Sequence, residues 1–192
     1  MAFYIKSIEE KGLIDFATDI LLQNKPICAP TDTIYGVLAL DNEEALNYLY
    51  KIRRPSKKPF LRLLPDISFL GYYSLVPTDK VYELSKIDGV SIILKAQDKN
   101  LGFRIPKKGF IKELLDKLQK PLLAPSCNKE GEPPAKSIEE AVRYFQDEIP
   151  LYIDGGFIDS VASSIVEIEN DKISIVREGM SIEKVKDILA RF

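Results

Sequence analysis

The sequence predicts an α/β protein, a mixed twisted sheet with flanking helices, formed as a single domain over residues 1–192. Amphipathic helical patterns alternate with short β-type runs for most of the length, which is typical of helices covering a sheet. Near the C-terminus, SSIVEIENDKISIVRE places two β-type runs around a Glu-Asn-Asp-Lys turn, which predicts an antiparallel hairpin. A hydrophobic content of 45% is enough for a substantial core.

Six segments have the pattern of helices. Three follow a residue that suits an N-cap and have Glu three positions later: Ser7 before IEEKGLIDFATDILLQ, Asp41 before NEEALNYLYKI, and Ser137 before IEEAVRYF. Apolar spacings of three and four residues predict further helices in TDKVYELSK, FIKELLDKLQ and SIEKVKDILARF. The β-type runs between them are PICAP, FLRLL, VSIILKA, LLAP, LYIDG, SSIVEIE and KISIVRE.

Composition excludes several classes of protein. A net charge of −2 and a pI near 5.4 argue against a surface devoted to nucleic acid, although a local basic cluster remains compatible with them. No long uncharged apolar run could span a bilayer, and the charged N-terminus does not resemble a signal peptide. We therefore expect a cytoplasmic protein without a membrane partner.

Histidine is absent, which removes the Ser-His-Asp and Cys-His mechanisms and histidine-ligated zinc. Any chemistry must then depend on Lys, Arg, hydroxyl groups, carboxylates or the substrate itself. Cys28 and Cys127 form no CxxC pair, so we expect buried free thiols. The sequence also lacks the P-loop, the GxGxxG fingerprint and EF-hand spacing.

The loop PTDTIYG carries more hydrogen-bonding groups than a turn needs, namely Thr31, Asp32, Thr33 and Tyr35. Downstream, YKIRRPSKKPFLRLL is either a solvated basic face, a set of cations complementing a helix C-terminus, or an anion-binding cradle. The polar loop SCNKEG follows a β-type run, where open α/β sheets usually bind ligands, but Ser and Asn are also ordinary turn residues.

Two further arginines lie at the ends of β-type runs. Arg104 in GFRIPKKG needs an anionic partner if it is buried, and that partner is either a protein carboxylate or a ligand. The same alternatives apply to Arg177 in IVREGM. Ser163 and Ser164, taken alone, read as ordinary strand residues.

In their order along the chain, these stretches resemble the motifs of the YrdC/TsaC family, the threonylcarbamoyl-AMP synthases of tRNA modification. The family pattern is PTDT-x-YG, K-x-R-P with a following K-P, R-x-P, S-x-N-x-x-G, S-[ST]-[IV]-V and R-x-G. This sequence has PTDTIYG, KIRRPSKKPF, FRIP, SCNKEG, SSIV and REG between Pro30 and Gly179. Six motifs in register make the resemblance specific, whereas each alone is weak.

The resemblance implies a YrdC-like fold and a reaction in which L-threonine, bicarbonate and ATP give threonylcarbamoyl-AMP and pyrophosphate. It implies magnesium bound with the ATP substrate, no tightly held protein-ligated metal, and a downstream threonylcarbamoyl transferase complex as partner. Two alternatives remain open: a non-catalytic relative that binds tRNA or double-stranded RNA, and a relative that uses carbamoyl phosphate.

The resemblance also implies site residues. Lys51 and Arg53 would be catalytic by aligning substrates and neutralising charge, without a general base. The expected ATP contacts are Tyr35, Lys51, Arg53, Ser126, Asn128 and Arg177. The expected threonine contacts are Thr33, Arg104 and Ser163.

Three features depart from the family pattern. The P-G-P-L-T segment is reduced to DGVSIIL, where Ser91 alone keeps the hydroxyl character. Cys127 replaces a usual Ala, and the segment from Leu61 to Lys86 matches poorly, which leaves substrate preference open.

Overall fold

The computed structural model describes residues 3–96 and 99–192. Its strands are β1 (Tyr4–Ser7), β2 (Ile27–Pro30), β3 (Tyr35–Leu40), β4 (Arg62–Leu63), β5 (Val90–Ala96), β6 (Lys99–Arg104), β7 (Leu122–Leu123), β8 (Leu151–Asp154), β9 (Ser164–Glu169) and β10 (Lys172–Arg177). Its α-helices are α1 (Leu13–Leu22), α2 (Glu43–Ile52), α3 (Asp79–Ser85), α4 (Gly109–Leu118), α5 (Ile138–Phe145) and α6 (Ile182–Leu189). Two 3₁₀ segments, η1 (Ile67–Tyr73) and η2 (Gln146–Glu148), complete the described elements.

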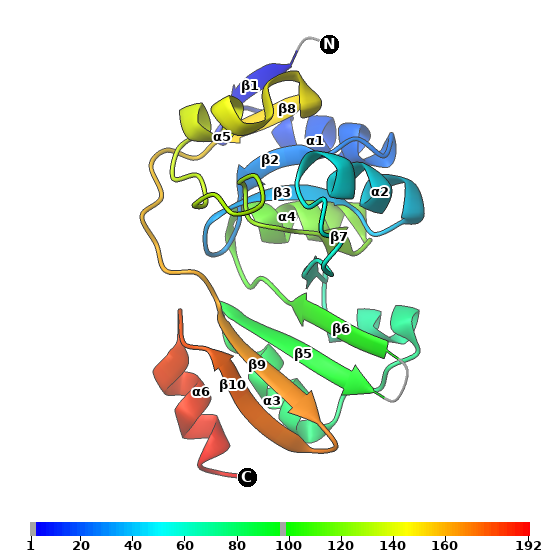
Figure 1. Cartoon of the computed structure of the whole chain (residues 1–192), viewed down its shortest axis with the longest axis vertical. Helices are drawn as coiled ribbons and strands as arrows, with labels where there is room; N and C mark the ends of the chain where they lie inside the picture. Colours follow the sequence, from blue (N-terminus) through cyan, green and yellow to red (C-terminus); the bar gives the residue numbers. More distant parts are fainter. Residues whose placement is uncertain (1–2, 97–98) are drawn as a thin grey trace.

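Within the described residues the strands form one sheet in the order β1-β8-β2-β3-β7-β4-β6-β5-β9-β10. The sheet is mixed, because β1–β8, β2–β8, β4–β6 and β5–β9 are parallel while the other neighbours are antiparallel. The predicted mixed α/β architecture is therefore confirmed. The two-residue strands β4 and β7 join two tiers, one containing β1, β8, β2 and β3, the other β6, β5, β9 and β10 (Figure 1).

Successive side chains along β2 and β3 point to opposite faces of the first tier. Because the side chains on both faces are apolar, helices cover both faces. Ile27 and Leu38 belong to the core cluster that contains α1 and α4, whereas Cys28 and Val37 belong to the cluster that contains α2 and α5. In the second tier, β5, β6 and β9 share a core with α3 and Val185 of α6. Segment 155–163, which we call the strap, leads from β8 in the first tier to β9 in the second (Figure 1).

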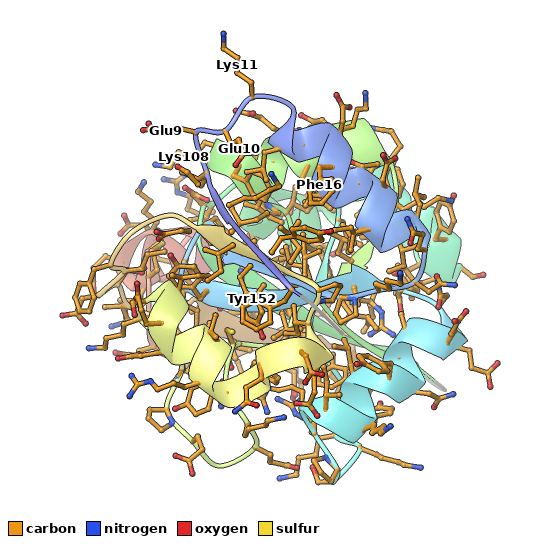
Figure 2. All side chains as sticks on the ribbon, turned by 90° about the horizontal axis from the view of Figure 1, so that it is seen from above. Glu9, Glu10, Lys11, Phe16, Lys108 and Tyr152 are labelled. Carbon is orange, nitrogen blue, oxygen red and sulfur yellow. The ribbon has the colours of Figure 1, made fainter. Side chains whose placement is uncertain are left out.

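The sequence analysis did not identify β1 or β3 as strands. Strand β3 has six buried residues in a row, so its sequence YGVLAL lacks the alternation that marks a half-exposed strand. The helix expected directly after Ser7 is wrong at its start, because Ser7 ends β1 and α1 begins at Leu13. Figure 2 shows Glu9, Glu10 and Lys11 on the loop between β1 and α1. Tyr152 of β8, also labelled there, is fully buried.

The other predicted caps lie at or next to the expected residues. Ser137 caps α5 by accepting a hydrogen bond from the Glu140 amide, as predicted. Helix α2 is capped by Asn42 instead of Asp41. The Asp41 carboxylate accepts hydrogen bonds from Arg62 Nε at 2.6 Å and the Tyr73 hydroxyl at 2.5 Å, so it contacts strand β4 and segment η1.

The predicted C-terminal hairpin is confirmed. Strands β9 and β10 pair antiparallel, and Asn170 and Asp171 between them have φ values of 48° and 62°. Two consecutive positive φ values are those of the turns that match the twist of a two-residue hairpin, and Asn and Asp tolerate them better than most residues.

The two cysteines are free and buried, as expected. The fold brings them together across 99 positions of sequence, with their Sγ atoms 2.9 Å apart. Burial raises the pKa of the Cys28 thiol well above its usual value, and the neighbouring Cys127 acts in the same direction. The neutral thiol form is therefore favoured at this position.

Candidate active site

A cavity of about 480 Å³ lies at the junction of the two tiers. The first tier and its loops line it with Thr31, Thr33, Ile34, Tyr35, Gly36, Arg54, Phe60, Ala124, Ser126 and Pro134. The second tier and the end of the strap line it with Ser91, Ile93, Gly102, Arg104, Ala162, Ser163, Ile165 and Arg177. Its volume is within the range of pockets that bind small molecules.

The PTDTIYG loop forms the connection between β2 and β3. Thr31 closes this turn, since its hydroxyl donates to the Ile34 carbonyl at 2.6 Å and its amide donates to the same oxygen at 3.1 Å. Gly36 lets the loop approach its neighbours, because a Cβ there would lie 3.0 Å from Thr31 Cγ2 and 3.4 Å from the Pro125 carbonyl oxygen. The Thr31 hydroxyl of this polar loop therefore stabilises the conformation of the loop itself.

Tyr35 lines the cavity, but its hydroxyl holds the strap. The hydroxyl donates to the Gly156 carbonyl at 2.8 Å and accepts from the Gly155 amide at 3.0 Å. Ser160 adds a second link by donating to the Thr33 carbonyl. Burial raises the pKa of Tyr35 to about 12, so the hydroxyl stays protonated near neutral pH.

Asp32 and Arg104 form a buried ion pair at the cavity. Nε and Nη2 of Arg104 lie 2.9–3.0 Å from the carboxylate oxygens, and the side chains of Arg104 and Asp32 are 6% and 0% exposed. Of the two partners left open for Arg104, the structure thus supplies the protein carboxylate. The remaining Arg104 donors bond Ser91 Oγ at 3.2 Å and Thr33 Oγ1 at 3.3 Å, so Arg104 orients two hydroxyl groups.

Arg177 joins the same network through Ser163. Its Nε and Nη2 donate to the Ser163 carbonyl at 3.0 and 2.8 Å, and the Ser163 hydroxyl lies 2.9 Å from that of Ser91. Burial and the nearby Arg104 lower the pKa of Arg177. Two guanidinium groups and one carboxylate leave one net positive charge, which favours an anionic group of a ligand here.

Arg53, Ser126 and Asn128 form a second cluster. Arg53 Nε donates to the Ser126 carbonyl at 3.1 Å, and Nη2 donates to Ser126 Oγ at 3.2 Å and Asn128 Oδ1 at 3.1 Å. Burial lowers the pKa of Arg53 to about 10, which leaves it charged at neutral pH. Of these three residues only Ser126 is among the cavity-lining residues, so Arg53 and Asn128 stand behind it.

Two residues of the basic run differ from the sequence interpretation. Lys51 is exposed on the last turn of α2 and is not among the cavity-lining residues, although it was expected to contact ATP. Arg54, which the sequence analysis did not single out, does line the cavity. The position of Arg54 directly before Pro55 could have identified it. A residue before proline is biased towards extended backbone, which indicates that the Arg54 side chain does not continue the surface of α2.

No group of three or more His, Cys, Asp and Glu side chains suited to a metal ion occurs among residues 3–96 and 99–192. The buried carboxylate of Asp32, which is not itself among the cavity-lining residues, is engaged by the lining residue Arg104. Across the part of the chain that the structure describes, the helices lack the combination of length and apolar character that a membrane span requires.

Comparison with known proteins places this chain in a family. Residues 19–179 match the Sua5/YciO/YrdC domain, described as "telomere recombination". A Methanocaldococcus jannaschii relative, provisionally named a threonylcarbamoyl-AMP synthase, is 31% identical over 186 residues, covering 90% of this chain and 88% of its own. Escherichia coli YciO, whose name states no function, is 25% identical over 187 residues, covering 89% and 91%.

A solved structure of similar fold is Pyrococcus abyssi Sua5 in complex with L-threonine. It has a TM-score of 0.87 and 20% identity, and the match covers 97% of this chain and 61% of the Sua5 chain. This chain thus spans about three fifths of Sua5, and at that identity the likeness shows the fold. With most of its length matched by the domain, the chain is a member of the Sua5/YciO/YrdC family.

Proposed function

We propose that this protein makes threonylcarbamoyl-AMP from L-threonine, bicarbonate and ATP, with release of pyrophosphate, for tRNA modification. The observation that carries the proposal is the cavity itself, a space of about 480 Å³ in which three arginine side chains and several small hydroxyl groups lie among apolar lining residues. Support comes from the named M. jannaschii relative and from the threonine bound by P. abyssi Sua5. The downstream threonylcarbamoyl transferase and any tRNA or double-stranded RNA contact belong to the same proposal.

The proposed chemistry needs positioning more than proton transfer. Threonine and bicarbonate condense to a carbamate with loss of water, and a carbamate oxygen attacks the α-phosphate of ATP while pyrophosphate leaves. No Asp or Glu is among the described cavity-lining residues, and the nearby carboxylate of Asp32 is buried in an ion pair with Arg104. The guanidinium groups would stabilise the charge that develops during phosphoryl transfer. Magnesium, bound by the ATP phosphates, would neutralise part of their charge.

We assign the threonine side to Thr33, Ser163 and Arg104. Arg104 would act by orienting the Thr33 and Ser91 hydroxyls, since its Nε–Nη2 edge already binds Asp32. The nucleotide side is assigned to Tyr35, Lys51, Arg53, Ser126, Asn128 and Arg177. Here Arg53 would hold the Ser126 hydroxyl in place.

The test of this function is pyrophosphate release from Mg·ATP, comparing a complete mixture with mixtures that lack threonine or bicarbonate. Release that requires both supports the proposal. Release that ignores threonine but responds to carbamoyl phosphate would replace it with carbamoyl transfer. No release by folded protein, together with salt-dependent RNA binding, would replace it with a binding function.

Thr33→Val tests the threonine side. The substitution keeps the shape but removes the hydroxyl, so the KM for threonine should rise about 10-fold, as expected for a lost hydrogen bond worth about 1.4 kcal/mol, with little change in ATP affinity. Thr18→Val is a matched control, because Thr18 Oγ1 is buried on α1 without a partner in the described chain. If the two variants have the same KM for threonine, Thr33 is not a threonine contact.

A further inference from the structure

The two cysteines of the sequence, Cys28 and Cys127, have no part in the proposed chemistry, and neither is among the cavity-lining residues. Both are 0% exposed and belong to the core cluster that contains α2 and α5. Their Sγ atoms lie 2.9 Å apart, although 99 positions of sequence separate the two residues. The sulfur atoms of a disulfide are about 2.05 Å apart, so the two sulfurs would need to approach by roughly 0.9 Å.

The backbones of the two cysteines are held to different degrees. Cys28 lies in β2, which pairs with β3 on one side and β8 on the other. Cys127 lies on the loop after β7, where its amide donates to the Tyr35 carbonyl at 2.9 Å and its carbonyl accepts from the Ala135 amide at 2.8 Å. Because β2 is paired on both sides, the loop that carries Cys127 would make most of the approach.

That loop also contributes to the cavity. Cys127 directly follows Ser126, which lines the cavity and accepts hydrogen bonds from Arg53 at 3.1 Å and 3.2 Å. Cys28 lies two residues before the PTDTIYG loop, which lines the cavity from the other side of β3. A bond between the sulfurs would therefore tie β2 to the loop after β7 and move Ser126 away from the position in which Arg53 holds it.

We propose that Cys28 and Cys127 form a reversible intramolecular disulfide when the protein reacts with a hydroperoxide, and that this bond weakens ligand binding in the cavity. One cysteine thiolate attacks a peroxide oxygen, so an S–O bond forms, the O–O bond breaks and hydroxide leaves, taking up the proton that the thiol lost. The second sulfur then attacks the sulfenic acid, so the S–S bond forms, the S–O bond breaks and water leaves. Two thiols and one hydrogen peroxide thus give one disulfide and two water molecules.

Burial of the pair favours a small oxidant and an intramolecular product. Hydrogen peroxide can reach a buried thiol through a local opening of the structure, whereas oxidised glutathione would have to place a whole tripeptide beside a residue that is 0% exposed. A second sulfur only 2.9 Å away can trap the sulfenic acid before more peroxide oxidises it further. Because the thiolate is the reactive form and burial disfavours it, the reaction should take on the order of hours.

The experiment treats the whole folded protein with hydrogen peroxide, alkylates the remaining thiols after unfolding, and identifies linked peptides by mass spectrometry. The chain should lose two hydrogen atoms and give one linked pair of peptides, containing Cys28 and Cys127, which dithiothreitol separates. Calorimetry before and after the reduction measures the affinity for Mg·ATP. The affinity should be about 10-fold lower in the oxidised protein, as expected when one hydrogen bond to a charged group is lost, and should recover on reduction.

Cys127→Ala is the matched control, because it removes one sulfur and introduces the small residue that the motif usually has. It retains both methionines of the chain, which peroxide also oxidises, so it isolates the effect of the cysteines. The ATP affinity of this variant should not respond to peroxide. Cys28→Ala provides the same control from the other side of the pair.

The outcomes separate this inference from the proposed function. Thiols that stay reduced, or that become sulfinic or sulfonic acids without a disulfide, would overturn the proposal, and so would a disulfide between two copies of the chain. A Cys28–Cys127 disulfide with unchanged ATP affinity would overturn its effect on the cavity. The disulfide itself does not depend on the proposed function, so a protein that forms it but binds no ATP in either state would contradict only the ATP-dependent function.

Discussion

Asp32 and Arg104 show how one residue of the PTDTIYG loop supports the cavity without facing a ligand. The Asp32 carboxylate is fully buried and accepts three hydrogen bonds from Arg104, each of 2.9–3.0 Å. Arg104 in turn holds the hydroxyl groups of Ser91 and Thr33. Loss of the carboxylate would leave a buried guanidinium without a counter-charge, which is far costlier than loss of a surface pair.

Asp32→Asn should therefore lower the free energy of unfolding by about 3–5 kcal/mol, measured by urea denaturation. Asp15→Asn is the matched control, because the Asp15–Lys117 pair joins side chains that are 68% and 55% exposed and should contribute little. If both variants unfold at the same urea concentration, the buried pair does not stabilise the protein. The threonine KM of Asp32→Asn should also rise, because the Thr33 hydroxyl loses its orienting partner.

At the scale of elements, the end of β10 depends on Gly179. A Cβ at this residue would lie 2.3 Å from the Ala162 carbonyl oxygen and 2.7 Å from that of Ser163. The close approach lets the Met180 amide donate to the Ala162 carbonyl at 2.9 Å and keeps Arg177 on Ser163. The glycine of the REG motif is thus explained by packing between β10 and the end of the strap.

Gly179→Ala should push this segment away from Ser163 and lower the melting temperature by several degrees, as expected for about 1–3 kcal/mol of overpacking. ATP affinity should fall as well, because Arg177 would move with the backbone. Gly71→Ala is the control, since an added Cβ there meets nothing within 4 Å and its φ is not positive. An unchanged melting temperature in Gly179→Ala would show that the segment adapts to the added methyl group.

At the scale of the whole molecule, stability should fall at alkaline pH. Burial raises the pKa of Tyr35 to about 12 and also raises those of Tyr73, Tyr152 and Cys28. Their folded pKa values exceed the unfolded ones, so the stabilisation they give is complete below the unfolded value, about 10 for tyrosine, and is lost as pH rises towards the folded value. Each such tyrosine contributes a slope of up to about 1.4 kcal/mol per pH unit.

Arg53, Arg177 and Lys107 act in the opposite direction, because burial lowers their pKa values, that of Arg53 to about 10, and the unfolded chain then binds the extra protons. Since Tyr35, Tyr73, Tyr152 and Cys28 outnumber these three groups, the unfolding free energy should decrease between about pH 10 and 12. It should change little between about pH 6 and 8, as histidine is absent. Urea denaturation at several pH values, with tyrosinate absorbance recorded in parallel, tests this. A constant unfolding free energy up to pH 12 would contradict it, and Tyr152→Phe should reduce the slope.

Local sequence was sufficient for much of the architecture. Caps and apolar spacing identified the helices, and the hairpin followed from Asn170 and Asp171. Strand β3 was not predicted because both of its faces are buried, so its sequence lacks the alternation of apolar and polar residues that marks a half-exposed strand. The start of α1 was misplaced because Ser7, a good cap by type, belongs to β1, which pairs with the distant β8.

The amino-acid pattern established the family motifs, the mixed α/β architecture and a histidine-free chemistry, since these depend on residue type and spacing along the chain. It did not establish which partner each arginine has. Asp32 lies 72 positions from Arg104, and their contact exists only after the two tiers of the sheet have packed together. Arg53 lies 73 positions from Ser126, and their contact exists only after the end of α2 has packed against the loop that follows β7. Tertiary structure alone distinguishes Arg53, whose Nε–Nη2 edge donates to Ser126 and Asn128, from its neighbour Arg54, whose Nε–Nη2 edge has no partner among the described residues. The reason is that the partners of these edges are residues distant in sequence.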